Sequence, residues 1–251
     1  MRLVSAISVS LLCVVYSAEL AFPSPPEAAQ ETKPSAVTVR QVLNRMATAY
    51  KECKSYCDSG VVKTEFFTKK EGRSHGEEKP FKTAFIRPDR FRFEYSAHAG
   101  PANMGPIRRY IVWRNAEQVK SYWDVQPKRE GQKSLGLALA GATGVSGGSA
   151  HTIPALLMPD EVGGRKLTDM TEIERLEDAK LGDVNCFQIQ GKFGGRDEVV
   201  WIDQSSFLVR RIDSKDTLGG DLRVETTTTY EPEVNKDIPE GMLDFSAPKP
   251  K

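Results

Sequence analysis

The chain has 251 residues, with 35 Lys and Arg against 34 Asp and Glu, so its formal net charge is +1. Because the two signs are interspersed and nearly balanced, nothing attracts nucleic acid over long range, and we expect no nucleic-acid partner. The part that follows Ala36 is within the normal range of a single domain and can bury a sizeable core.

The N-terminus predicts export. Arg2 is followed by an apolar run, Leu3 to Tyr16, which is too short to span a bilayer and ends in small residues, as a secretory signal does. Cleavage after Ser17 fits best, because Val15 and Ser17 then supply small residues at the recognition positions. We therefore expect a signal peptide over residues 1–17 and a periplasmic or secreted mature protein.

A lipoprotein signal at Cys13 is the alternative to this cleavage. It is disfavoured because Leu12 precedes the cysteine, where that processing requires Gly, Ala or Ser, and because it would shorten the apolar run.

The mature chain is expected to start with a spacer. Residues 22–36 are rich in Pro, Ala, Glu and Ser and lack the apolar periodicity needed for packing. We predict a flexible spacer over residues 18–36 and a single domain over residues 37–251.

A helix is predicted at the start of this domain, with Thr38 as its N-cap. Its apolar residues recur at helical spacing, at Val39, Val42, Leu43, Met46, Ala47 and Tyr50. Such a one-sided helix must lie on an apolar surface.

Beyond Gly60 the apolar period changes to two, which is typical of strands. Strands are predicted near residues 60–68, 81–87, 90–97, 109–114, 119–123, 171–179, 185–193, 197–203, 208–214 and 222–230. Asn115-Ala116 is predicted to form a tight turn. Consecutive strands joined by short turns favour an antiparallel meander.

One predicted hairpin, Thr83 to Tyr95, has a strongly aromatic face. Phe91, Phe93 and Tyr95 alternate with charged residues, after a turn that contains Arg87-Pro88. An Arg-Pro turn before a Phe-x-Phe-x-Tyr strand resembles the second hairpin of the LolA/LolB-like family, the periplasmic carriers of lipoproteins and related lipid-binding domains.

The order of the remaining elements extends this resemblance from Thr38 to Ala247. Between the two groups of strands, residues 133–160 are apolar but interrupted by several glycines and ended by prolines, so no long helix is expected there. The resemblance implies a mainly β (α+β) fold: a curved antiparallel sheet, or half-barrel, with an N-terminal helix and a short central helical lid on its concave face. It also implies that Arg87 hydrogen-bonds this lid and holds it shut, although a surface arginine at a turn remains an equal alternative.

One helix and a glycine-rich lid offer little bulk to fill a deep concavity, so apolar volume could remain for a ligand. The candidate lining residues are Phe91, Phe93, Tyr95, Trp113, Tyr122 and Trp201, with Leu156, Leu157 and Met158 as contacts from the lid. The alternative is that these residues form an ordinary packed core.

Motifs for chemistry are weak. The glycines of residues 141–147 lack the preceding parallel strand and the following long helix of a dinucleotide site, and there is no P-loop sequence. His75, His98 and His151 have no metal-ligand spacing, and no acid and base pair stands out among the carboxylates. We expect no enzyme activity, no cofactor and no metal.

Three cysteines follow the predicted signal peptide, which is an odd number for an oxidising compartment. Cys53 and Cys57 are four residues apart on one predicted helical face, where a bridge would be strained. The prediction is a disulfide between Cys53 and Cys186, with Cys57 left over, although Cys186 shares its strand face with Gln188 and not with Phe187.

The sequence thus predicts an exported, monomeric carrier that binds a lipid or the acyl chain of a lipoprotein, with envelope membrane proteins as further candidate partners. The runner-up is an envelope interaction or sensor domain with a filled core and no lipid. An envelope hydrolase comes third.

Overall fold

The computed structural model describes residues 37–68, 72–99, 105–116, 118–219 and 221–246, with side chains for all of these except 73–74 and 126–130. The expected signal peptide and spacer, residues 1–36, lie outside the described residues. Val37–Lys251 group into one compact unit, to which the described helices and strands belong.

The unit is built on a sheet of 13 described strands, which is antiparallel as the sequence predicts, although the sequence predicted only ten strands. The strands are β1 (Ser55–Thr68), β2 (Gly72–Ile86), β3 (Arg90–His98), β4 (Ile107–Asn115), β5 (Gln118–Trp123), β6 (Gln126–Gly131), β7 (Thr171–Arg175), β8 (Ala179–Leu181), β9 (Val184–Phe193), β10 (Arg196–Asp203), β11 (Val209–Leu218), β12 (Leu222–Tyr230) and β13 (Glu233–Val234). Their order is β6-β5-β4-β3-β2-β1-β12-β11-β10-β9-β7, with β13 beside β1 and β8 beside β9. The mainly β, antiparallel half-barrel is confirmed.

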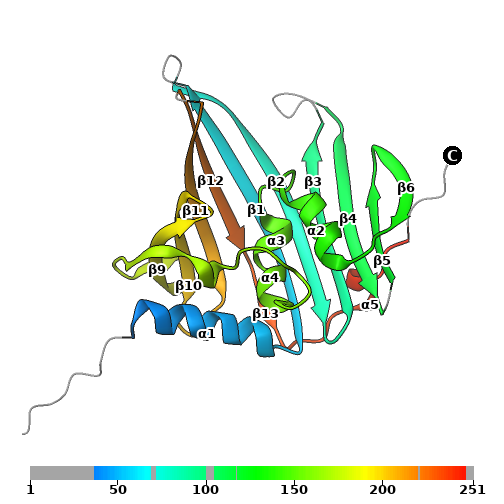
Figure 1. Ribbon diagram of the computed structural model, residues 1–251, viewed down its shortest axis with the longest axis horizontal. Helices are drawn as coiled ribbons and strands as arrows, with labels where there is room; N and C mark the ends of the chain where they lie inside the picture. The colour runs from blue at the N-terminus through cyan, green and yellow to red at the C-terminus, as the bar shows by residue number, and fades with distance from the viewer. Residues whose placement is uncertain (1–36, 69–71, 100–104, 117, 220, 247–251) are drawn as a thin grey trace, which may run out of the picture. The chain divides into compact units, whose positions relative to one another are not determined.

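The sheet order explains where the lid lies. β1 pairs with β12 and joins the two groups of strands, so β6 and β7 stand at the two ends of the strand order. The segment between β6 and β7 therefore has to cross one face of the sheet. It contains α2 (Leu135–Thr143), α3 (Ser149–Thr152), α4 (Pro154–Leu157) and the 3-10 turn η2 (Leu167–Asp169), and these helices lie in front of the sheet in Figure 1.

Helix α1 (Val39–Glu52) covers part of the same face, near one end of the strands (Figure 1). Thr38 caps it as predicted: its hydroxyl accepts a hydrogen bond from the Gln41 amide, and the Gln41 side chain accepts one from the Thr38 amide. The buried side of the helix is the predicted apolar stripe, Val42, Leu43, Met46 and Tyr50.

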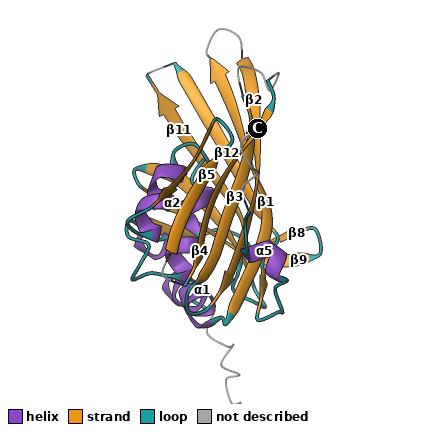
Figure 2. Cartoon of the chain, turned by 90° about the vertical axis from the view of Figure 1, so that its right-hand side faces the viewer, coloured by secondary structure: helices purple, strands orange, loops and turns teal. Residues whose placement is uncertain are grey.

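We call the helix-covered side of the sheet the concave face. It carries Phe91, Phe93, Val200 and Ile202, and it forms one apolar core with α1 and the lid helices. The opposite, convex face carries a separate small cluster of Ile111, Trp113 and Tyr122 beneath Phe245. Helix α5 (Glu240–Leu243) lies on the convex side, away from α1 and α2 (Figure 2).

Several element bounds differ from the prediction. β2 begins at Gly72 rather than near Phe81, although Pro80 lies inside it. The β2–β3 pairing ends at Phe81 and Tyr95, so β3 offers no backbone partner at Pro80. The N–H that proline lacks therefore costs no hydrogen bond between these strands. The strand expected over residues 171–179 is divided into β7 and β8, and β6 was not predicted.

None of the helices in the described part of the chain is long and apolar enough to cross a membrane.

Candidate functional site

The centre of the concave face is an aromatic surface. Phe91 and Phe93 are fully buried and Tyr95 is 6% exposed, all on β3, where alternation turns them to the same side. Their rings continue across strands: the Phe81 centroid lies 6.2 Å from that of Phe93, and the Tyr110 centroid lies 5.8 Å from that of Tyr95. Neighbouring strands thus share one belt of rings, at spacings typical of favourable aromatic pairs.

The lid covers this surface with apolar side chains. Leu156, Leu157 and Met158, from α4 and its C-terminal cap, are 3%, 0% and 4% exposed and belong to the same core as Phe91 and Phe93. Helix α2 adds Leu135 and Leu139 to that core. Burial of one such side chain contributes about 1.5–3 kcal/mol, so the lid is held mainly by apolar contacts.

Three of the predicted lining residues lie elsewhere, and that part of the prediction is wrong. Trp113 and Tyr122 are buried on the convex face, where Phe245 packs on both rings at centroid distances of 5.1 Å. The β3–β4 register explains this, because Phe91 stands opposite Arg114, and Trp113 therefore points to the other side. Aromatic content alone does not distinguish the two faces.

Trp201 also lies on the convex face. Its neighbours on β10, Val200 and Ile202, belong to the concave core, so alternation turns Trp201 outward. Its indole N–H donates to Asp213 at 2.9 Å, and the Arg211 guanidinium lies over the ring. Trp201 therefore stabilises an exterior polar cluster.

Arg87 joins the lid to helix α1. Its Nη2 donates to the carbonyl oxygens of Leu157 at 2.9 Å and Tyr50 at 3.1 Å, and its Nε donates to the carbonyl of Cys53 at 2.7 Å. Two of these carbonyls end α1, where a cation is favoured, and the third belongs to the lid. The Arg87-Pro88 bond that leads out of β2 is cis.

A second buried arginine, which the sequence did not reveal, holds the same end of the lid. Arg114 is 8% exposed; its Nε donates to the Asp89 carbonyl at 2.8 Å, and its Nη1 forms an ion pair with Glu161 beyond α4. Its Nη2 also lies 3.7 Å from the Met158 sulfur. In the sequence, the one feature that could have revealed Arg114 is its place in the alternation of β4, which turns it to the concave face, opposite Phe91.

The predicted disulfide is not formed: Cys53, Cys57 and Cys186 are free thiols. Cys53 lies on the core side, at the end of α1, and Cys57 lies in β1 rather than in the helix. Cys186 is on the convex side of β9, because its neighbour Phe187 belongs to the concave core. The sheet thus separates the two cysteines that were expected to pair.

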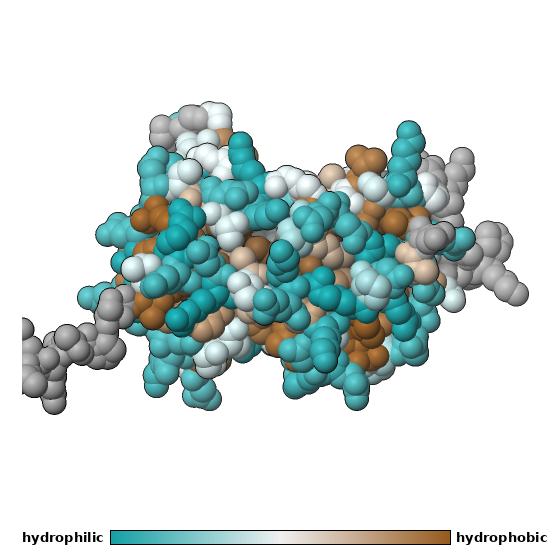
Figure 3. Space-filling view, turned by 60° about the horizontal axis from the view of Figure 1, so that its bottom comes forward, coloured by the Kyte–Doolittle hydropathy of each residue, from teal (hydrophilic) through white to brown (hydrophobic). Residues whose placement is uncertain are grey.

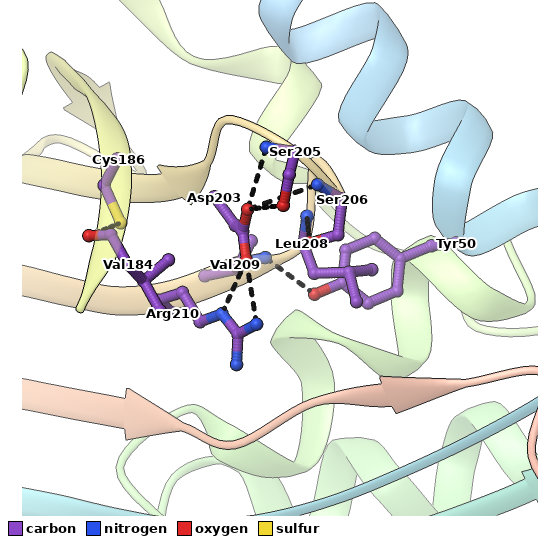
Figure 4. A network of polar contacts seen from close by, with 9 residues as sticks. All are labelled: Tyr50, Val184, Cys186, Asp203, Ser205, Ser206, Leu208, Val209 and Arg210. Atoms are coloured by element: carbon purple, nitrogen blue, oxygen red, sulfur yellow. Dashed lines mark hydrogen bonds and ion pairs between the residues drawn. The ribbon is translucent and has the colours of Figure 1, made fainter. Parts of the chain in front are cut away.

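The surroundings of Cys186 belong to a structural network at the β10–β11 turn (Figure 4). Asp203 accepts hydrogen bonds from Ser205 and from the Ser206 amide, and forms an ion pair with Arg210 at 2.8 Å. Burial opposes ionisation of Asp203, but these donors outweigh it and lower its pKa. In Figure 4, Tyr50 accepts from the Val209 amide at the opposite end of this network from Cys186.

A buried carboxyl, Asp58, lies within the apolar core. Its oxygens accept from the Tyr56 hydroxyl at 2.8 Å and from the Thr83 amide at 2.9 Å. Desolvation raises the pKa of Asp58 to about 6, although both hydrogen bonds oppose the shift. The native state therefore holds the proton more tightly than the unfolded chain does.

This linkage predicts that acid stabilises the fold. The contribution of Asp58 is complete below its ordinary pKa near 3.8 and is lost as pH rises through about 6, which amounts to about 3 kcal/mol at most. In Asp58→Asn that loss should vanish, because the amide stays neutral and its NH₂ can donate to the Tyr56 oxygen. Urea unfolding of both proteins at pH 4 to 8 measures the difference, and equal pH slopes would contradict this assignment.

A pocket of about 260 Å³ lies beside the lid, between its glycine turn and strands β10 to β12. Among its lining residues are Gly147, Glu198, Thr228 and Tyr230. No group of three or more His, Cys, Asp or Glu among the described residues is placed to hold a metal ion.

Fold and site together define an open antiparallel sheet with an apolar concave face beneath a latched helical lid. No family model and no curated protein sequence matches the chain. Solved structures of similar fold include LprF from Mycobacterium bovis, with 11% identity over 80% of this chain and 94% of that one and a TM-score of 0.47. Another is a LolA superfamily protein from Nitrosomonas europaea, with 11% identity over 84% of this chain and 99% of that one and a TM-score of 0.30.

A third similar structure is the MucA/MucB complex of Pseudomonas aeruginosa, with 11% identity over 82% of this chain and 60% of the matched chain and a TM-score of 0.41. A protein of the LolA superfamily, the family that the hairpin was predicted to resemble, is thus among the solved structures similar to this one. What the protein binds has to be argued from its own residues.

Proposed function

We propose that the protein is an exported, non-enzymatic carrier of the bacterial cell envelope that binds a lipid or the acyl chain of a lipoprotein on the concave face, after the lid moves aside. The observation that carries this proposal is the chemistry of the lid contact. The side chains of Leu156, Leu157 and Met158 belong to the same apolar core as Phe91 and Phe93, so an acyl chain could replace these side-chain contacts with contacts of the same apolar kind.

The connections of the lid favour its movement as a unit. Its short helices are joined by a turn with Gly147 and Gly148 at φ of +66° and +91°, and it is attached to the sheet at β6 and β7, the two ends of the strand order. Polar latches at Arg87 and Arg114 hold its end near α4. Opening would exchange apolar contacts for ligand contacts, and only these few polar bonds would need to break.

The outer surface is compatible with a carrier that keeps its apolar binding surface covered until transfer. On the side shown in Figure 3, hydrophobic residues form separate patches among hydrophilic ones. An exported protein with its lid closed would then avoid aggregation and expose apolar area only during transfer.

The test is native mass spectrometry of the full chain, expressed with its own leader in a bacterial host and purified from the periplasmic fraction. The intact mass also checks cleavage after Ser17 and the spacer that should follow it. We expect co-purified phospholipid or acyl species in organic extracts. Apo protein that also fails to bind a hydrophobic dye would contradict carriage.

One observation favours the runner-up function, an envelope interaction or sensor domain that carries no lipid. Phe85, Phe91 and Phe93 are fully buried, so the aromatic face is filled in the closed state. If the lid never opens, partners can meet only the outer surface, and the dye experiment separates this possibility from carriage.

A further inference from the structure

The pocket beside the lid differs from the aromatic centre of the concave face because it is polar. Its floor is a row of side chains from three neighbouring strands, Glu198 on β10, Ser214 on β11 and Thr226 on β12, placed side by side by the strand register. Its roof is the lid turn at Gly147, where an added Cβ would lie 2.7 Å from a methyl carbon of Val62. The turn therefore lies directly against the sheet.

Glu198 is the exceptional group in this pocket. It is 6% exposed, and within the part of the chain that the structure describes no hydrogen bond or ion pair reaches its carboxylate. Arg196, on the same face of β10, also lines the pocket and is exposed to solvent, and no ion pair joins it to Glu198 within the described residues. Burial raises the pKa of Glu198 to about 7, while the field of Arg196 opposes the shift. A carboxylate in so buried a position favours a hydrogen-bond donor, which makes Glu198 the group of this pocket best placed to accept one from a ligand.

The walls beside Glu198 connect polar and apolar surroundings. Thr226 and Thr228 offer hydroxyl groups, whereas Ile212 and Tyr230 line the pocket and also belong to the apolar core. An occupant could thus place a donor group at Glu198 and direct a hydrocarbon chain toward the core. The volume of about 260 Å³ is enough for a small head group and the first carbons of a chain.

We propose that Glu198 binds the primary ammonium head group of an acyl-bearing or alkyl-bearing ligand, whose chain continues beneath the lid. An ammonium supplies a positive charge and three donors, which the carboxylate and the oxygens of the neighbouring hydroxyls can accept. The inference rests on the proposed carrier function and adds the charge of its ligand.

The test compares two twelve-carbon amphiphiles below their micelle concentrations, dodecylammonium and dodecanoate, by titration calorimetry on the full chain. The wild type should bind dodecylammonium at least about tenfold more tightly. Glu198→Gln should weaken dodecylammonium by about tenfold and leave dodecanoate unchanged or tighter. The variant should fold, because it keeps the shape and replaces a buried titratable group by a neutral one; Glu198→Leu is the second variant if it does not.

Asp197→Asn is the matched control, since Asp197 is the next residue on β10, faces the opposite side and carries the same charge. It should bind both amphiphiles as the wild type does. Equal loss in both variants would mean that overall charge governs binding and would overturn the assignment. Equal binding of both amphiphiles, unchanged by Glu198→Gln, would overturn the ammonium site alone, whereas no binding of either would overturn carriage as well.

Discussion

Arg87→Leu is expected to lower the free energy of unfolding by about 2–4 kcal/mol and to release the lid. The substitution removes three donated hydrogen bonds and leaves the carbonyls of Tyr50, Cys53 and Leu157 without them. Leucine keeps much of the apolar stem, so the loss is mainly polar. Hydrogen exchange measured by mass spectrometry should accelerate in residues 153–158, and ligand release in a transfer assay should become faster.

Arg90→Leu is the matched control. Arg90 belongs to the same hairpin, but its guanidinium pairs with Glu240 on the convex side, and Glu240 is exposed. We expect a loss below about 1 kcal/mol and no change in exchange of the lid. If Arg87→Leu accelerated exchange in α1 but not in residues 153–158, Arg87 would serve only to cap that helix, and the latch would have to be abandoned.

Local patterns predicted most of the fold. The capping box at Thr38, the helical stripe of α1 and the alternation on β3 each depend on a few neighbouring residues, and the structure confirms them. The lid position was implied by the resemblance, and topology requires it once β6 and β7 are known to end the strand order.

The candidate site was predicted less well because it depends on register between distant strands. A shift of one residue exchanges the two faces of a strand, so Trp113, Tyr122 and Trp201 could not be assigned by their chemistry. Arg114 and Glu198 were missed for the same reason, since charged residues in strands usually face solvent and these two face the core side.

The largest loss of stability is expected for Phe93→Ala, at about 3–5 kcal/mol. Phe93 is fully buried between Phe81 and Tyr95, and it faces the lid from the centre of the concave side. Removal of the ring leaves a cavity among well-packed neighbours that can relax only in part. Urea unfolding of the purified variant measures the loss.

Phe67→Ala tests whether this loss reflects the concave face rather than aromatic content. Phe67 lies on the convex side of β1, is half-buried and has Arg223 over its ring, so we expect a loss of about 1 kcal/mol. The same comparison bears on function. If the concave face binds acyl chains, the cavity in Phe93→Ala should change the affinity for a hydrophobic dye, while Phe67→Ala should leave it unchanged. A dye affinity that responds equally to both substitutions would place the apolar binding surface outside the lid, because only one of the two rings lies beneath it.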